Sequence, residues 1–361
     1  MPTPLSPDLR ILESVALAPY TTFQIGGPAR FFCEIHAESA LLEAVQFARQ
    51  QGLAIFVLGG GSNLLVSDAG FNGLVLHLAI DTPARTTPND RYVDITVPAG
   101  LDWNAFVLQV CEHGISGVEC LAGIPGMVGG SPIQNIGAYG QEVANTIHSV
   151  RALDLETLTF VSLSREACGF AYRRSIFNST HRGRYIVIQV TFRFDATATP
   201  NLTYTDLAKH FAAQLESGQT PKPMEVYDAV RAIRYNKGML VVEGEQDSRS
   251  AGSFFKNPVV SSATLDLLAA NLAIEPTSIA HWPAERGQIK LAAAWLLERA
   301  GFHKGFTLGE AGISSRHTLA LINRGHATAR DIATLRDTIQ QEVKSRFNIQ
   351  LEQEPVQIGD V

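Results

Sequence analysis

The chain has 361 residues and a formal net charge of -6; 45% of its residues are hydrophobic and 18% are charged. This length allows two or three domains with sizeable cores, and the composition argues against extensive disorder. The acidic balance argues against general nucleic-acid binding, which depends on excess lysine and arginine. The opening residues, MPTPLSPDLR, lack the features of a signal peptide, and no apolar stretch approaches the length of a membrane span. We therefore expect a cytoplasmic protein that binds neither nucleic acid nor membrane.

The cysteines support a reducing compartment. Cys33, Cys111, Cys120 and Cys168 are widely spaced and form no C-x-x-C pair. This spacing favours reduced core thiols over disulfides or a zinc site. We expect no metal ion in the protein.

The first predicted elements form a βαβ unit. Strand patterns cover residues 31–35 and 54–58, and a helix pattern over 38–50 ends at Gly52. The second strand runs into FVLGGGSNLLV, residues 56–66. Glycine permits positive φ and leaves backbone N–H groups uncovered, so such a run can form a nest for a phosphate.

This first glycine loop, residues 59–63, matches neither common phosphate motif. A Rossmann fingerprint opens a helix and a Walker loop needs a Gly-Lys pair, whereas residues 64–66 and 74–76 here are strand patterns. The loop is therefore predicted to bind phosphates in a fold of another kind. An ordered turn without a ligand is the alternative that this stretch leaves open.

A longer loop follows a second strand and helix. The strand is predicted over 92–97, and the helix over 102–113 ends at Gly114. The second glycine loop, LAGIPGMVGGSPIQNIGAYGQE at 121–142, has six glycines and two prolines, and ordered loops of this length are usually functional. Farther along, alternation over 184–194 predicts a strand whose residues 186, 188, 190, 192 and 194 share one face.

Helical patterns dominate the second half of the chain. They cover residues 224–236, 264–272, 289–300 and 328–347, and the last begins with the capping pattern Thr328-Ala329-Arg330-Asp331. Residues 319–322 are strand-like. The change in composition predicts a domain boundary near residues 216–224.

Four stretches together resemble the UDP-N-acetylenolpyruvoylglucosamine reductase family, flavoenzymes of peptidoglycan precursor synthesis. They are GGGSN at 59–63, IPGMVGGSPIQNIGAYG at 124–140, YRRSIF at 172–177 and AGSFFKNP at 251–258. LTYTDL at 202–207 and IRYNKG at 233–238 are also similar to that family. The resemblance covers almost the whole chain, although GGGSN alone would suit other flavoproteins.

The resemblance implies a non-Rossmann α/β (α+β) fold with non-covalent FAD. FAD-binding subdomain I would comprise residues 1–84 plus 351–361, subdomain II 85–222, and a third, substrate-binding domain 223–350. The first loop would follow the FAD pyrophosphate, and the second would wrap the isoalloxazine and the rest of the diphosphate. The implied cofactor contacts are Gly59, Gly60, Gly61, Ser62, Asn63, Ile124, Pro125, Gly126, Gly129, Gly130, Gln134, Asn135, Gly137, Ala138 and Tyr139.

The implied reaction is NADPH-dependent reduction of a UDP-sugar enolpyruvyl ether to UDP-N-acetylmuramate, in two half-reactions. Hydride addition places negative charge on the neighbouring carbon and its carboxylate, and a cation would stabilise it. Arg173 matches the family's arginine for this role, whereas Arg174 is the better candidate for an exposed ion pair. The implied substrate contacts are Tyr172, Tyr204, Arg234, Lys237 and Asn257.

Two further catalytic residues follow from the resemblance. Ser253 matches the family's proton donor, although by sequence alone it would be an ordinary turn or cap residue. The tail LEQEPVQIG, residues 351–359, aligns Glu354 with the family's catalytic glutamate, while Pro355 and Gln357 depart from the pattern. Period-2 geometry cannot decide between Glu354 and Glu352, because both would point to one face of a strand.

Two rival interpretations remain open from the sequence. One is a flavin oxidase of the same broad fold, which often binds FAD covalently; the other is a non-catalytic nucleotide-binding regulator. Presence of Arg173, Ser253 and Glu354 together speaks against the regulator.

The family role would connect the protein with cell-wall biogenesis, cell shape, the cell cycle and division, and we expect a monomer. The acidic loop GMLVVEGEQDSRSA, residues 238–251, is longer than expected and has no assigned role.

Overall fold

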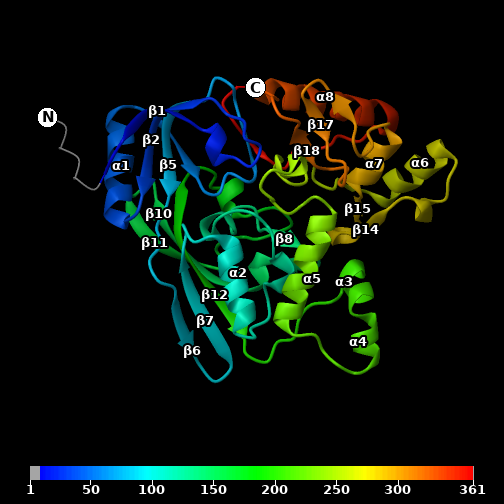
Figure 1. Cartoon of the computed structure of the whole chain (residues 1–361), viewed down its shortest axis with the longest axis horizontal. Coiled ribbons are helices and arrows are strands. Elements are labelled where there is room, and N and C mark those ends of the chain that lie inside the picture. Colours follow the sequence, from blue (N-terminus) through cyan, green and yellow to red (C-terminus); the bar gives the residue numbers. More distant parts are fainter. Residues whose placement is uncertain (1–8, 361) are drawn as a thin grey trace. The chain divides into compact units, whose positions relative to one another are not determined.

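The computed structural model describes residues 9–360 (Figure 1). Contacts divide the chain into two compact units. Among the described residues, unit 1 contains 9–15, Ala29–Gly61 and Asn72–Asn236, and unit 2 contains Ala16–Pro28, Ser62–Phe71 and 237–360. The three-domain division proposed from the sequence stays a prediction.

One sheet, mainly in unit 1, has four strands in the order β1-β2-β5-β3. The strands and the helix after β2 are β1 (Leu12–Ala16), β2 (Pro28–Ile35), α1 (Glu38–Gln50), β3 (Ala54–Leu58) and β5 (Phe71–Leu78). β3 pairs in parallel with β5, which therefore lies between β2 and β3. Leu41 and Val45 of α1 join Leu74 and Leu76 of β5 in one buried core. The strand, helix and strand predicted over 31–58 are confirmed.

A second sheet of unit 1 is antiparallel, in the order β11-β10-β12-β7-β6. Its strands are β6 (Arg85–Pro88), β7 (Tyr92–Pro98), β10 (Ile147–Asp154), β11 (Thr159–Ser164) and β12 (Tyr185–Asp195), and the helices of this unit after α1 are α2 (Trp103–Glu112), α3 (Thr205–His210), α4 (Ala212–Glu216) and α5 (Pro223–Asn236). Asp102 caps α2 by accepting the Ala105 N–H. Phe106 of α2 packs on Phe192 of β12 with ring centroids 4.6 Å apart, so the predicted helix and strand bury their apolar faces together.

The apolar residues of β12 do not share one face, contrary to the alternation read from the sequence. Ile186 and Ile188 pack in the core with α1, whereas Val190 and Phe192 pack in the core with α2. The register against β10 shifts between Arg151 and Ala152, which marks a β-bulge. One extra residue in a strand changes which face the following side chains occupy.

In the described part of the chain, unit 2 combines short strands with three α-helices. Its elements are β4 (Leu64–Val66), β13 (Val259–Val260), α6 (Ser262–Leu272), β14 (His281–Pro283), β15 (Ile289–Leu291), α7 (Ala293–Arg299), β16 (Thr307–Leu308), β17 (Ala311–Ile313), β18 (Leu321–Asn323), α8 (Ala329–Phe347) and β19 (Val356–Ile358). The predicted capping box of α8 is present, with Thr328 and Asp331 each accepting the other's backbone N–H. Asp68, which follows β4, also accepts the Ala329 N–H at 2.7 Å and so ties that segment to α8.

The helix predicted over 289–300 is wrong in its first turn. Ile289–Leu291 forms β15, which pairs antiparallel with both β13 and β14, and α7 starts only at Ala293. A short apolar run gives no reliable distinction between a buried strand and a helix, and here two available partner strands decided the outcome.

The four cysteines are buried free thiols, as expected. Burial raises the pKa of Cys33 and Cys168 to about 12, so neither is a reactive thiolate near neutral pH. Among residues 9–360, no helix is both long enough and apolar enough to cross a membrane.

Candidate functional site

The two glycine loops approach each other within unit 1. A Cβ on Gly60 would lie 2.6 Å from the Cα of Gly126, so the backbones meet where only glycine fits. Gly61 has φ of +60° and Gly126 has φ of +135°. Residues other than glycine rarely adopt these backbone conformations. The residues present therefore fit a ligand that needs close backbone approach, such as a dinucleotide diphosphate.

Part of the second glycine loop is held by its own hydrogen bonds. The Gly129 N–H donates to Ala99 O at 2.9 Å, and the Gly130 N–H donates to Met127 O at 3.0 Å. A Cβ on Gly129 would lie 2.6 Å from the Ala99 Cβ. These two amides are engaged within the chain, so the anion-donor role inferred for glycine amides does not extend to them. Gly129 is required here by close packing.

Three non-glycine residues near this loop adopt the left-handed backbone conformation. Asn135, Tyr139 and Arg173 have φ of +46°, +48° and +53°. Such conformations cost on the order of 1–3 kcal/mol each and cluster at functional sites. All three are residues for which the family resemblance implies a role.

Asn135 connects the second glycine loop to the YRRSIF stretch. It is 1% exposed; its Nδ2 donates to Glu142 Oε2 at 2.8 Å and to Ala171 O at 3.0 Å. Its Oδ1 accepts the Ala144 N–H at 3.0 Å. The amide therefore uses both its donor and acceptor sides to hold three segments together.

Arg173 lies at the tip of a tight turn, between residues that pair as a short antiparallel bridge. Ala171 and Arg174 exchange two backbone hydrogen bonds, each of 3.0 Å. The Arg173 guanidinium donates to Gly137 O at 2.7 Å and lies 5.3 Å from the Tyr172 ring centroid. Arg173 is half-buried against the second glycine loop, whereas Arg174 is exposed, as the sequence suggested.

Unit 1 also groups Tyr139, Tyr204 and Arg234. The two tyrosine rings meet edge to face with centroids 5.1 Å apart. Arg234 lies on α5, is 7% exposed and hydrogen-bonds Tyr139. Burial lowers the pKa of the Arg234 guanidinium, and the hydrogen bond to Tyr139 opposes that change. An aromatic pair beside a buried cation is suited to a nucleotide-sugar anion.

In unit 2 the tail pairs with the serine segment, residues 251–258. The Glu354 N–H donates to Phe254 O at 2.8 Å, and Phe255 forms an antiparallel bridge with Gln353. Phe254 and Phe255 are almost fully buried, while Ser253 and Glu354 are half-buried. The structure therefore brings these two predicted catalytic residues to paired backbone segments.

The register of the tail is fixed from a second side. The Val356 N–H donates to Asn63 O at 2.8 Å, and β19 pairs in parallel with β4, directly after the GGGSN motif. Glu352 has a different environment, because its side chain is 74% exposed and meets Lys256 at 3.4 Å. Both glutamates therefore lie along the serine segment, but Glu352 is an exposed surface residue opposite Lys256, whereas Glu354 is half-buried and pairs with Phe254, the residue after Ser253.

Comparisons with known proteins agree with this geometry. Residues 244–358 match the model of the UDP-N-acetylenolpyruvoylglucosamine reductase C-terminal domain, and residues 29–162 match an FAD binding domain. A UDP-N-acetylenolpyruvoylglucosamine reductase from Thermobifida fusca is 42% identical over 352 residues, covering 96% of this chain and 98% of the relative. One from Neisseria meningitidis is 40% identical, covering 94% and 95%. The chain belongs to this family.

A solved structure supports the same assignment at the level of the fold. The crystal structure of UDP-N-acetylenolpyruvylglucosamine reductase from Thermus caldophilus matches 97% of this chain and 100% of its own, with a TM-score of 0.66 and 26% identity. The chain is therefore an FAD-dependent oxidoreductase of α/β fold, as the motifs indicated. Family membership sets aside the covalent-flavin oxidase and the non-catalytic regulator.

Other family-implied residues have varied surroundings. Asn257 accepts the Ala293 N–H at 2.9 Å at the start of α7, which gives it a capping role whatever its contact with substrate. Lys237 is half-buried directly after α5. No local pattern marks Asn104 of α2, whose side chain accepts the Gly123 N–H at 2.6 Å and donates to Ile124 O at 3.1 Å. Asn104 thereby holds the start of the second glycine loop.

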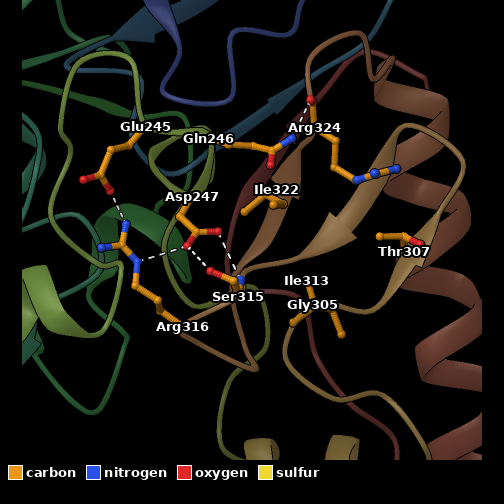
Figure 2. A pocket seen from close by; sticks show the side chains of 10 residues that line it. All are labelled: Glu245, Gln246, Asp247, Gly305, Thr307, Ile313, Ser315, Arg316, Ile322 and Arg324. Atoms are coloured by element: carbon orange, nitrogen blue, oxygen red, sulfur yellow. Dashed lines mark hydrogen bonds and ion pairs between the residues drawn. The ribbon is translucent and has the colours of Figure 1, made fainter.

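The acidic loop is ordered by Arg316, as Figure 2 shows. The carboxylate of Asp247 accepts from Arg316 Nε at 3.0 Å and from the Ser315 N–H at 3.1 Å, and Glu245 pairs with the same guanidinium. These residues line a polar cavity of about 510 Å³, with Gly305, Thr307 and Arg324 also on its wall. A Cβ on Gly238 would lie 3.0 Å from Arg316 Nε, so the guanidinium packs on the turn after Lys237.

We expect Gly60→Val to remove bound FAD, because its Cβ would force the backbones of the two glycine loops apart. Flavin absorbance of the purified protein, and FAD released on denaturation, measure the effect. Ala54→Val is the matched control, since it adds the same two methyl groups at an exposed position of β3. Stoichiometric FAD in the Gly60→Val protein would contradict the fit argued above.

Asp247 should make unfolding pH-dependent. Burial acts to raise the pKa of the Asp247 carboxyl, but hydrogen bonds from Ser315 and Arg316 together outweigh burial and hold that pKa below its ordinary value. A carboxyl with a lowered folded-state pKa contributes stability above about pH 4, which is lost as the pH falls through the folded-state value. Asp247→Asn should cost about 1–3 kcal/mol in urea unfolding at pH 7.

The difference between parent and Asp247→Asn should shrink as the pH falls below about 4, where the parent carboxylate becomes protonated. The control is Asp266→Asn, at an exposed position of α6, which should lower the free energy of unfolding little, both at pH 7 and below about pH 4. A pH-independent loss in Asp247→Asn would show that its charge does not matter.

Proposed function

We propose that the chain reduces UDP-N-acetylenolpyruvoylglucosamine to UDP-N-acetylmuramate with NADPH, using Arg173, Ser253 and Glu354 as its catalytic residues. Bound FAD supplies the hydride chemistry that links NADPH to the enolpyruvyl double bond. The observation that carries the proposal is the pairing of the serine segment with the tail, because it gives Ser253 and Glu354 adjacent backbone positions. The product is a peptidoglycan precursor, so the enzyme serves cell-wall biogenesis and thereby cell shape and division.

Arg173 is proposed to stabilise the charge that develops on the substrate carboxylate. Hydride addition to the terminal vinyl carbon leaves an electron pair on the substituted carbon, which delocalises into the carboxylate. A guanidinium offers a planar pair of N–H donors for a carboxylate. Its hydrogen bond to Gly137 O and its strained backbone support pre-organisation of Arg173 for this task.

Ser253 is proposed to donate the proton that completes the reduction. The Oγ–H bond breaks as a C–H bond forms at the substituted carbon, and the serine regains a proton from water. A hydroxyl is a weak acid, so this step requires a strongly basic carbon acceptor. Partial burial of Ser253 supports this role, because it limits competing water.

Glu354 is proposed to stabilise the same enolate-like charge. In its protonated form a glutamic acid donates a hydrogen bond, which a carboxylate cannot do. Pro355 favours an extended backbone at Glu354. The amide hydrogen bond of Glu354 to Phe254 O supports a fixed position for this residue.

The two glycine loops are proposed to hold FAD, and Tyr172, Tyr204, Arg234, Lys237 and Asn257 to bind the UDP-sugar substrate. The close approach of Gly60 and Gly126 supports the first assignment, and the Tyr139, Tyr204 and Arg234 cluster supports the second. We further propose that the enzyme acts in the cytoplasm as a monomer. Sedimentation at several concentrations tests the oligomeric state.

An anaerobic experiment tests the proposed activity. NADPH should bleach the visible flavin absorbance of the purified protein, and the enolpyruvyl nucleotide should then restore it. A protein that NADPH reduces but that the enolpyruvyl nucleotide fails to reoxidise would exclude this substrate.

We expect Ser253→Ala to leave flavin reduction by NADPH nearly intact and to slow reoxidation by the enolpyruvyl nucleotide by roughly 10²- to 10⁴-fold. Stopped-flow absorbance separates the two half-reactions. Ser262→Ala, at an exposed position of α6, is the matched control and should change neither rate. Equal slowing of both half-reactions by Ser253→Ala would assign Ser253 to structure or shared binding.

The tail register gives a separate prediction. Glu354→Gln keeps the size and a donor of the side chain, so it should slow flavin reoxidation less than Glu354→Ala does. Glu352→Gln removes only an exposed partner of Lys256, and turnover should stay within a few-fold of the parent. If single-turnover traces instead show that Glu352→Gln loses reoxidation while Glu354→Gln keeps it, the catalytic glutamate is Glu352.

A further inference from the structure

Glu119 is a fully buried acid with no role in the reaction described above. It opens a short 3₁₀ turn, Glu119–Leu121, at the start of the second glycine loop, and it is 0% exposed. Its Oε2 accepts the Gly117 N–H at 2.5 Å, and its Oε1 accepts Gln141 Nε2 at 2.7 Å and the Asn201 N–H at 3.2 Å. Burying a carboxyl group costs free energy of folding unless hydrogen-bond donors satisfy it. These three donors therefore explain how the fold accommodates Glu119.

Two partners of Glu119 extend the network to separate loops. Gln141 is the second-last residue of the second glycine loop, and its Oε1 accepts the Cys120 N–H at 2.9 Å. Asn201 begins the stretch that contains LTYTDL; its Nδ2 donates to Gly140 O at 3.0 Å, and its Oδ1 accepts the Thr203 N–H at 3.0 Å. Through Asn201 and Gln141, Glu119 therefore holds the two loops together.

The network ends beside the aromatic pair. Tyr139 precedes Gly140, and Tyr204 follows Thr203, so the tethered residues are the chain neighbours of the two rings. Those rings meet at 5.1 Å, and Tyr139 hydrogen-bonds the buried Arg234. A change at Glu119 would reach the two tyrosines through their chain neighbours, and Arg234 through its hydrogen bond to Tyr139.

We propose that Glu119 is a positioning residue, which sets the Tyr139 and Tyr204 loops for binding of the UDP-sugar substrate. The inference rests on the proposed function, because Tyr204 and Arg234 are assigned to that substrate. The competing explanation is that Glu119 stabilises unit 1 without a specific effect on substrate binding. A positioning role predicts weaker binding of the enolpyruvyl nucleotide in flavin reoxidation, with flavin reduction by NADPH spared. A purely structural role predicts lower stability and no change in that binding.

Glu119→Gln tests the proposal with the smallest change in shape. The amide replaces one acceptor oxygen by an NH₂ group, which then faces an N–H donor at a position where only an acceptor fits. We expect the apparent Kd of the enolpyruvyl nucleotide in flavin reoxidation to rise roughly 10- to 100-fold, the equivalent of losing a hydrogen bond to a charged group. Flavin reduction by NADPH should stay within a few-fold of the parent.

Asp154→Asn is the matched control in the same unit. Asp154, the last residue of β10, is also buried, at 3% exposed. Its carboxylate forms an ion pair with Arg184 at 2.7 Å, outside the Glu119 network. Asp154→Asn should lower stability without separating the two half-reactions. If Glu119→Gln and Asp154→Asn lower stability alike and leave the Kd of the enolpyruvyl nucleotide unchanged, Glu119 has only a structural role and the proposal is overturned.

Asn201→Ala covers the case in which Glu119→Gln does not fold. This variant keeps Glu119 satisfied by its backbone N–H partners and removes only the side-chain bonds to Gly140 and Thr203, at a half-buried position. It should raise the same Kd while sparing reduction by NADPH, and an unchanged Kd would overturn the proposal. Failure of the parent enzyme to be reoxidised by the enolpyruvyl nucleotide would instead reject the proposed function.

Discussion

The proposed chemistry depends on one set of backbone contacts, those that the tail makes with the serine segment and with Asn63. The Glu354 N–H bonds to Phe254 O, and the Val356 N–H bonds to Asn63 O. Phe254 and Phe255 fill the core of unit 2, so a one-residue slip of this pairing would expose a large aromatic side chain. Core packing and backbone bonds therefore set the positions of Ser253 and Glu354.

Unit 1 follows a different principle, because its functional segments carry local strain. Gly60 and Gly126 approach too closely for any side chain, and Tyr139 and Arg173 hold left-handed backbones that cost on the order of 1–3 kcal/mol each. The three segments joined by Asn135 hold this strained region in place. Burial of the large aromatic core around Phe106 and Phe192 contributes the folding free energy that offsets this strain.

Sequence reasoning succeeded where the signal was local. The helices α1, α2 and α8 have strong periodicity and recognisable ends, and Thr328 with Asp331 marks the start of α8. It failed at residues 289–291, where partner strands decided the structure, and along β12, where a bulge changed the face. The motifs that contain Arg173 and Ser253 are specific enough to identify the family from sequence, and the catalytic roles of these two residues stay a prediction. Glu119, Asn104 and the Asp247–Arg316 pair act through contacts distant in sequence, and no local pattern marks them.

The chemistry of Glu119 and Gln141 explains why this buried site uses an acid beside an amide. Three N–H groups converge on Glu119, so its position requires acceptors only, which an ionised carboxylate supplies. Gln141 must donate to Glu119 and also accept the Cys120 N–H, which requires both kinds of group in one side chain. Exchanging the two residues would place an NH₂ group against a backbone N–H of Gly117 or Asn201. The hydrogen-bond pattern thus selects which residue is charged, and it links the choice of an acid at this turn to the placement of two tyrosines elsewhere in unit 1.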